Sequence, residues 1–447
     1  MTPFGESDGG TDTSGDALVP ADATPVAPGP MTSTILAYNP GATAANAVLH
    51  IYDTGGTEVS HTATSIAAQG VVVVPMPAGL PYSFLGTGML TSDARIETFT
   101  LDANATNAAR DLADSAPAPS TELTFPIFRH DGAAAGQTIV SVQNTDPTQT
   151  ATVKFHYYDQ QGNELSGSPV VRTIAPLGSS AFDSLTLFGT ILFAGTARVE
   201  STLPVVASEQ IMFMLDTGSL RGLADSEAAT SFELNWVEQS STKWSEIYVT
   251  NRDTNPATVT VKYYTTTGAS RATDTQTILA NGSHIFNTNN PQVGAQFSGY
   301  ATVTQTGSSP LMVSGLNMEN TGKILYAYHG VPQTRATAIW ACGDVQHIGQ
   351  PAQFTTFKIV NADPGQANIV LSLFDPATGQ RKLNRPYKLA VGTELSIITS
   401  DAAFNPLGKN YVGLGTVQAT NGARVLVTGF NSYGSGGITS FTCTSSP

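Results

Sequence analysis

The chain has 447 residues, of which 40% are hydrophobic and only 12% are charged, and its formal net charge at pH 7 is −14. This balance excludes a disordered chain, and the sequence contains no apolar run long enough to span a membrane as a helix. The 20 Lys and Arg residues form no cluster along the sequence, which argues against nucleic acid and anionic membranes as partners.

In chain order, the first segment is residues 1–30, which are acidic and rich in Gly, Pro, Thr and Asp. Such a composition buries little apolar surface, so it predicts a flexible tail or linker. Its only run of three apolar residues is Ala17-Leu18-Val19. The N-terminus has neither a basic start nor an apolar stretch, so we expect that a leader was removed or that export uses another route.

After the tail, one module recurs four times. Each copy has an Asn turn, an alternating strand that ends in an aromatic residue, and a Gly turn. The anchoring asparagines are 105, 107 and 110 residues apart, a period that suits one β-sandwich domain rather than one coil of a solenoid. The four sets are Asn39, 47–53 and Gly56; Asn144, 153–159 and Gly162; Asn251, 259–264 and Gly268; and Asn361, 369–375 and Gly379.

Short strands separated by turn residues predict an all-β chain, and no stretch shows sustained helical periodicity. We expect four tandem Ig-like β-sandwich modules with a flexible N-terminal tail. The expected modules are residues 31–120, 121–229, 230–334 and 335–447.

Module 1 differs from the others at its start. Modules 2, 3 and 4 begin with an extra strand, at residues 125–128, 232–236 and 338–341. At the matching place module 1 has residues 24–30, which contain three prolines, and proline cannot donate to a strand ladder. The sequence therefore predicts that module 1 lacks its first strand and has an open edge. The tail of a neighbouring chain, or residues 17–28 of the same chain, could fill this edge.

The motifs together resemble tandem Ig-like β-sandwich repeats of secreted and cell-surface bacterial proteins, notably of Chloroflexota-type bacteria. The likeness is carried best by residues 144–162, 251–268 and 297–301, and it covers nearly all of residues 31–447. It implies a sandwich fold and an extracellular structural or adhesive role. It carries over no catalytic residue.

The only two cysteines, Cys342 and Cys443, fall in the first and last strands of module 4. Such strands often lie near each other, so we predict a disulfide that closes a loop of about 100 residues. The alternative is two unpaired buried thiols. A disulfide would indicate an oxidising compartment, which favours an extracellular or cell-surface location.

An aromatic residue recurs at the end of the repeated strand, on the face opposite the aliphatic side chains. Three roles remain open for it: covering a neighbouring loop, packing against the next module or another subunit, or stacking on sugar rings. The four residues are Tyr52, Tyr158, Tyr264 and Phe374.

The sequence contains no motif of a nucleotide, serine hydrolase or zinc site, so we expect no enzyme, no catalytic residue, no metal ligand and no cofactor. The Asn-x-Asp turns at Asn144, Asn251 and Asn361 could offer oxygens to Ca²⁺, but capping of their own backbone explains them better. Asn104 and Asn281 begin two sequons and are candidate glycosylation sites.

These observations predict a non-enzymatic extracellular structural protein, a rod of four modules that self-associates into a surface filament, sheath or surface layer. The alternative is an adhesin or carbohydrate-binding repeat protein, in which the outward aromatic residues contact a glycan. A viral tail or capsid decoration protein is a third reading. In each case we expect no nucleic acid partner and no membrane insertion.

Overall fold

The computed structural model describes most of the chain after the tail, and the N-terminal residues 1–30 lie outside the described residues. The described ranges are 31–39, 41–68, 70–74, 77, 80, 84, 86–104, 110–114, 119–131, 136–213, 216–320, 323–349, 352–375, 380–433 and 438–445. Their secondary structure is almost entirely β, with one short α-helix and three 3₁₀ turns among these residues. The all-β prediction is therefore confirmed. We refer to the four sequence copies as repeats 1 to 4.

Repeat 1 forms two separate antiparallel sheets, with the orders β4-β1-β6-β7 and β3-β2-β5. Buried Ala37, Leu49, Ile51 and Ile66 form the centre of its core. The strands are β1 (Met31–Tyr38), β2 (Ala45–Asp53), β3 (Glu58–Ile66), β4 (Val71–Val74), β5 (Gly86–Ser92), β6 (Glu97–Asn104) and β7 (Arg110–Asp114).

Repeat 2 has counterparts of these strands, with those of β5 and β6 joined in the single strand β13, and an additional first strand, β8. This strand pairs with β13 and turns into β9 by a hairpin, and β13 also pairs with β9, so the sheet nearly closes on itself. The elements are β8 (Ser120–His130), β9 (Gly136–Asn144), β10 (Ala151–Asp159), β11 (Val170–Ile174), β12 (Ser179–Asp183), α1 (Ser184–Phe188), β13 (Phe193–Phe213), β14 (Asp216–Arg221), β15 (Leu223–Ala224) and a 3₁₀ turn (Asp225–Glu227).

Repeats 3 and 4 follow the same plan, with β16 and β25 as their first strands. Repeat 3 contains β16 (Ser231–Gln239), β17 (Lys243–Asn251), β18 (Ala257–Thr265), β19 (Ser270–Ile278), β20 (Ser283–Asn287), β21 (Phe297–Gln305), β22 (Leu311–Glu319), β23 (Lys323–His329), β24 (Val331–Pro332) and a 3₁₀ turn (Gln333–Arg335). Repeat 4 contains β25 (Ile339–Gly349), β26 (Ala352–Asn361), β27 (Ala367–Phe374), β28 (Arg381–Leu389), β29 (Glu394–Ile398), a 3₁₀ turn (Ala402–Leu407), β30 (Asn410–Ala419), β31 (Val425–Tyr433), β32 (Ile438–Thr442) and β33 (Thr444–Ser445).

The alternation of apolar and polar residues explains why the repeated strand forms. Along β18, Val259, Val261 and Tyr263 are buried in the core, whereas Thr258 and Lys262 are exposed. Successive side chains of a strand point to opposite faces, so the sequence pattern becomes one buried face and one outward face.

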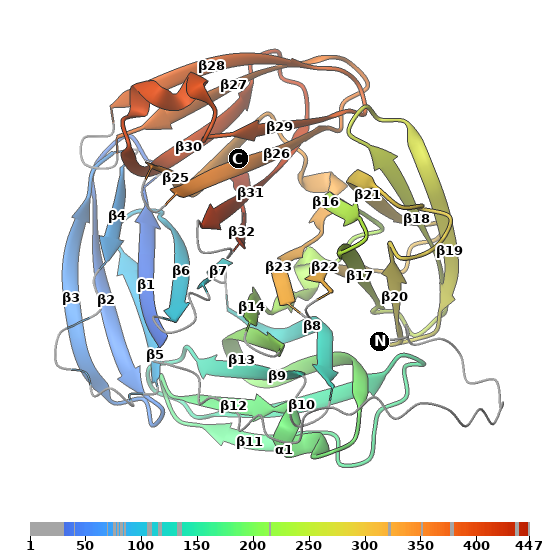
Figure 1. Ribbon diagram of the computed structural model, residues 1–447. Helices are drawn as coiled ribbons and strands as arrows, with labels where there is room; N and C mark the ends of the chain where they lie inside the picture. Colours follow the sequence, from blue (N-terminus) through green and yellow to red (C-terminus); the bar gives the residue numbers. More distant parts are fainter. Residues whose placement is uncertain are drawn as a thin grey trace, which may run out of the picture.

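The four repeats form a closed ring and not a rod (Figure 1). In each repeat an outer layer of strands, such as β3-β2-β5, faces the circumference, and an inner layer, such as β4-β1-β6-β7, faces the centre. The last inner-layer strands β7, β14, β23 and β32 contact one another in turn, and β32 returns to β7. The predicted rod is therefore wrong, because the contacts between successive repeats bring repeat 4 back to repeat 1.

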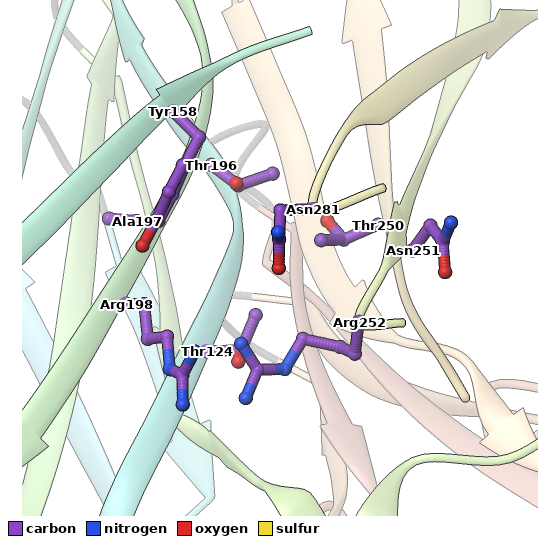
Figure 2. A pocket seen from close by; sticks show the side chains of 9 residues that line it. All are labelled: Thr124, Tyr158, Thr196, Ala197, Arg198, Thr250, Asn251, Arg252 and Asn281. Carbon is purple, nitrogen blue, oxygen red and sulfur yellow. The ribbon is translucent and has the colours of Figure 1, made fainter. Parts of the chain in front are cut away.

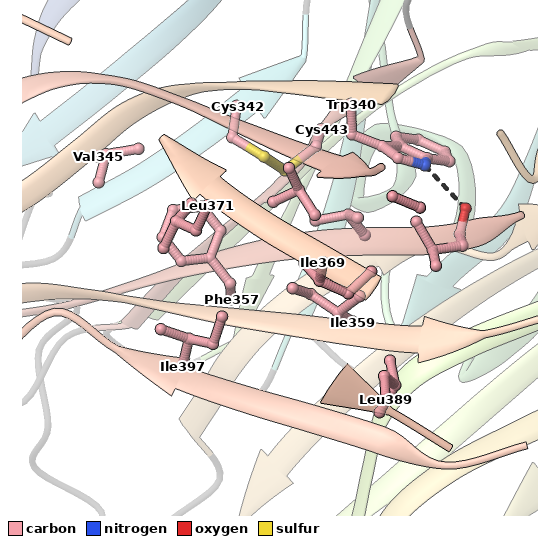
Figure 3. Packing of buried hydrophobic residues seen from close by; sticks show 14 of the residues in the cluster. Trp340, Cys342, Val345, Phe357, Ile359, Ile369, Leu371, Leu389, Ile397 and Cys443 are labelled. Atoms are coloured by element: carbon pink, nitrogen blue, oxygen red, sulfur yellow. Dashed lines mark hydrogen bonds between the residues drawn. A yellow bond between two sulfur atoms is a disulfide. The ribbon is translucent and has the colours of Figure 1, made fainter. Parts of the chain in front are cut away.

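A disulfide joins Cys342 on β25 to Cys443, which lies between β32 and β33, inside the core of repeat 4 (Figure 3). Both sulfurs pack among buried apolar residues that include Trp340, Val345 and Phe357. Beside them, β33 pairs with β25, and the Trp340 indole donates a hydrogen bond to the Val425 carbonyl at 2.8 Å. The bond therefore fastens the end of the described chain to the first strand of its own repeat.

Reduction of this disulfide should destabilise the protein by on the order of 4 kcal/mol, because the bond closes a loop of 101 residues in the unfolded chain. The measurement is the denaturant midpoint with and without reductant, and a Cys342→Ser/Cys443→Ser double variant is the control that reductant should not affect. Two thiols that react with an alkylating agent in the native, unreduced protein would contradict the assignment.

Candidate functional site

No described group of three or more His, Cys, Asp or Glu side chains is placed to hold a metal ion. Among the described helices, none is both long and apolar enough to cross a membrane. His50 and His156, which sit at matching places, each contact a nearby glutamate, Glu58 and Glu164 respectively. The recurring residues of the sequence motif instead meet at the joints between repeats, and these joints are the candidate site.

The anchoring asparagine acts as a clip inside each repeat. The Nδ2 of Asn144 donates to the carbonyls of Gln149, Ile174 and Ala175 at 2.7, 3.2 and 3.1 Å, and its Oδ1 accepts from the Asp146 amide. Each matching side chain makes three equivalent donations and accepts the amide two residues later, and all four asparagines are buried. The other three are Asn39, Asn251 and Asn361.

This clip fixes the turn that follows β3, β11, β19 or β28 in its repeat. Ile174 and Ala175 precede a turn in which the Gly178 amide donates to the Ala175 carbonyl, and the Asn144 amide donates to the Gly178 carbonyl. We call this the receiving turn. Its third residue has a left-handed backbone in three repeats, with φ of 58° at Leu177, 55° at Asn281 and 61° at Gly392.

The Gly turn of each of the first three repeats docks onto the receiving turn of the next repeat. The backbone hydrogen bonds are Ser179 N to Thr54 O at 3.1 Å, Ser283 N to Gln160 O at 3.0 Å, and Glu394 N to Thr266 O at 2.9 Å. The glycines are at the closest approach: a Cβ on Gly162 would lie 2.0 Å from the Ala280 carbonyl oxygen. The fourth turn glycine, Gly379, lies outside the described residues.

Glycine is required at these turns for two separate reasons. Gly56, Gly162 and Gly268 have φ of 87°, 83° and 80°, where a side chain is strained. In addition, a Cβ would overlap a backbone carbonyl of the adjacent repeat, which cannot move as a flexible side chain could. The sequence motif is therefore a docking motif between repeats.

Replacement of Gly162 by alanine should destabilise the protein by about 2–5 kcal/mol, from about 1–2 kcal/mol of backbone strain and about 1–3 kcal/mol of overpacking. Gly422→Ala is the matched control, because Gly422 also has a positive φ, 74°, but nothing lies within 4 Å of the added Cβ. The denaturant midpoints of the two variants give the comparison. Equal midpoints would mean that the Gly162 turn does not form the joint.

The four recurring aromatic residues are buried or partly buried, and three of them lie at joints. Tyr264 stacks on Tyr300 with ring centroids 5.0 Å apart, and the Tyr300 hydroxyl donates to the Gly392 carbonyl of repeat 4 at 2.6 Å. Phe374 packs against a buried cluster that includes Tyr38 of repeat 1. Tyr158 lines a small cleft shared with repeat 3, described next, and Tyr52 is only 4% exposed.

The cleft between repeats 2 and 3 is lined by two arginines, one from each repeat (Figure 2). Arg198 and Arg252 enter it from the two repeats, and both lie near the Glu122 carboxylate. Arg252 also contacts Asp225 of repeat 2 at 2.7 Å, and its side chain is only 9% exposed. Two carboxylates of repeat 2 therefore hold one arginine of repeat 3.

The first strands carry a bulge whose residue inserts into the next repeat. In β8, Phe125 pairs with Ala197 and Phe128 pairs with Gly195, so Pro126 and Ile127 between them have no ladder partner. Ile127 is fully buried in a cluster with Leu316, Met318 and Ile324 of repeat 3.

The bulge recurs at the same place in β16 and β25. In β16 the bulge residue Trp236 packs edge-on against Phe430 of repeat 4, with ring centroids 4.6 Å apart. The Lys358 ammonium lies 5.0 Å from the centre of the Trp236 ring. Trp236 is therefore part of the joint between repeats 3 and 4.

The joint between repeats 3 and 4 also buries acidic side chains. Lys358 contacts Glu394 at 2.7 Å, and both side chains are buried. Burial raises the pKa of the Glu233 carboxyl to about 8, and the neighbouring Glu394 carboxylate adds to this shift. Glu233 is therefore protonated at neutral pH in the folded protein.

The stability of the protein should fall as the pH rises through 8, because Glu233 binds its proton more tightly in the folded state than in the unfolded chain. This contribution is fully present below the ordinary glutamate pKa of about 4.3. Glu233→Gln should melt at the same temperature as the native protein at pH 4 and at a higher temperature at pH 8.5. Parallel melting curves across this range would contradict the buried protonated carboxyl.

The two candidate glycosylation sites have different surroundings. Asn281 lines the cleft between repeats 2 and 3, and Ser283 of the same sequon is buried and donates its amide to Gln160. This position favours an unmodified asparagine. Asn104 ends β6, and the rest of its sequon lies outside the described residues.

Sequence reasoning missed that the Gly turn of one repeat and the receiving turn of the next contact each other. It also missed Arg129, whose guanidinium donates to the Tyr248 hydroxyl of repeat 3 at 3.1 Å. Two signals could have found these residues. The two turns recur together, 13 to 16 residues apart in every copy, and Arg129 and Lys358 are charged residues next to short apolar runs in a chain with few charges.

No known protein-family model matches this chain, and no curated protein matches it either. The function is therefore inferred from the contacts between the repeats.

Proposed function

We propose that the protein is a non-enzymatic structural protein of the cell exterior and a subunit of a surface filament, sheath or layer. Its residues 31–120, 121–229, 230–334 and 335–447 are four Ig-like β-sandwich units that close into one rigid ring. The observation that carries the proposal is the docking of each described Gly turn onto the next receiving turn. Because the recurring residues hold the repeats together, we infer that they determine the shape of the protein.

Two further features support an extracellular role. The buried disulfide suits an oxidising compartment, where such bonds persist. The low content of charged residues leaves few Lys and Arg side chains for protease recognition. Both features are common to proteins that must last outside the cell.

Assembly of rings would use the circumference, because the described joints are already occupied within one chain. The strands β3, β11, β19 and β28 each end their sheet and pair on one side only, and they lie at the rim (Figure 1). A strand edge of this kind is a template for pairing with another chain. Pro386 in β28 has no backbone N–H to donate to a second strand, whereas β19 has no proline and is mostly exposed.

The variant Thr275→Lys/Thr277→Lys should prevent assembly, because lysines on an edge strand disfavour pairing with a second edge. Both threonines are exposed, so the melting temperature should stay within about 1 °C of that of the native protein. The measurements are negative-stain microscopy and sedimentation velocity, with Thr152→Lys on β10, which has a partner strand on both sides, as the control for a lysine added away from a sheet edge. Native protein that stays monomeric and binds a glycan array would favour the adhesin alternative.

The adhesin alternative depended on the outward aromatic residues. Since Tyr264 and Phe374 pack at joints, their replacement by serine should lower stability and leave any glycan binding unaffected. Loss of glycan binding with an unchanged melting temperature would reverse the order of the two proposals.

A further inference from the structure

Among the described residues, the joint between repeats 1 and 2 lacks the first strand that the other joints contain. The first strands β8, β16 and β25 each pair with the outer layer of their own repeat, with β13, β21 and β30 respectively. Each also packs against the inner layer of the next repeat: β8 on β17 and β22, β16 on β26 and β31, and β25 on β1 and β6. Within the described part of repeat 1, β5 pairs with β2 alone, and no strand takes this position.

One wall of this position is β5. Gly88 is exposed and Leu90 is partly exposed, although Leu90 points into the core of repeat 1. The matching residues in the other repeats are all buried beneath the first strand. They are Ala197 and Val199, Ala301 and Val303, and Gly415 and Val417.

The opposite wall is the inner layer of repeat 2. Ser141 on β9 and Ser208 on β13 are exposed, and Gln210 is partly exposed. The matching residues of repeats 3 and 4, which meet a first strand, are 6% exposed or less. They are Tyr248, Ser314 and Leu316, and Lys358, Thr428 and Phe430. Both walls are therefore uncovered at the places where a first strand lies in the other joints.

We propose that residues 17–23 of the same chain occupy the position between these two walls, which we call the slot, as the first strand of repeat 1. The chain already leads there, because Met31 begins β1, the counterpart of β9, and β9 follows β8 by a short hairpin. Closing so short a loop costs little entropy. A segment from another molecule would also lose translational and rotational freedom on binding.

The sequence of the segment fits the bulge of a first strand. If Pro20 takes the place of Pro126, then Ala17 and Val19 match Leu123 and Phe125, which face the core of repeat 2. Pro126 needs no ladder partner, because it lies in the bulge of β8. A proline at this place is therefore compatible with a central strand, and the prolines of residues 24–30 fall in the hairpin.

In this register, the side chains of residues 17–23 also match the size of the slot. Ala21 takes the place of Ile127, and it faces the small residues Ser141 and Ser208 rather than a large apolar surface. Val19, as the counterpart of Phe125, lies against the exposed Gly88 of β5. The small residues on both walls suit a segment of Ala, Val and Pro.

Hydrogen–deuterium exchange of the full chain, read by mass spectrometry, tests the proposal. The amides of residues 17–23 should exchange at least tenfold more slowly than those of residues 5–13, and equally at 1 and 100 μM protein. Val19→Asp should remove this protection and speed exchange in β5. Thr13→Asp, which places the same charge outside the segment, is the control and should change neither.

The other outcomes overturn the proposal in distinguishable ways. Protection that appears only at the higher concentration, together with a larger sedimentation coefficient, would mean that the tail of a second copy fills the slot. Rapid exchange of residues 17–23 at both concentrations would mean that the slot stays open. The wild-type measurement decides between these outcomes even if Val19→Asp does not fold, and it does not depend on the proposed surface role.

Discussion

The whole architecture depends on a backbone contact between two turns. A glycine with positive φ brings one turn against the carbonyls of the next repeat, and one amide of the receiving turn closes a hydrogen bond to it. The receiving turn keeps its shape because a buried asparagine donates to the carbonyls at its base. Loss of the clip would leave buried carbonyls unpaired, at about 1–3 kcal/mol each.

A contact between two different surfaces of similar units builds an open filament unless its rotation closes. Here four units close, and the inner-layer strands β7, β14, β23 and β32 meet at the centre. Closure within one chain occupies the surfaces that would otherwise join separate molecules. This is the physical reason why a rod, the simplest expectation for tandem modules, is not formed.

The joints share their backbone contact but differ in their side chains. Arg252 with Glu122 and Asp225 marks the joint between repeats 2 and 3, and Lys358 with Glu394 marks the next one. A repeat docked in the wrong order would leave Arg252, whose side chain is only 9% exposed, without its two carboxylate partners, which is costly. The shared turns thus supply attraction, and the particular charges supply the order of the repeats.

The chain has few charged residues overall, and several of them are buried at the joint between repeats 3 and 4. Glu233 remains protonated beside Glu394, and the Lys358 ammonium sits between Glu394 and the ring of Trp236. Lys358 and Glu394 pair within repeat 4, and repeat 3 contacts them through the Trp236 ring and the Glu233 carboxyl. Their burial therefore couples the folding of one repeat to the presence of the next.

The sequence by itself determined the strands, the four copies of the motif and the pairing of Cys342 with Cys443, because these follow from alternation, turn chemistry and a count of two cysteines. Only the tertiary structure decided that the copies form a ring, that Gly162 meets Ala280, and that Tyr264 serves a joint. A turn glycine looks the same in sequence whether it faces water or another repeat, and partners more than 100 residues apart leave no local pattern.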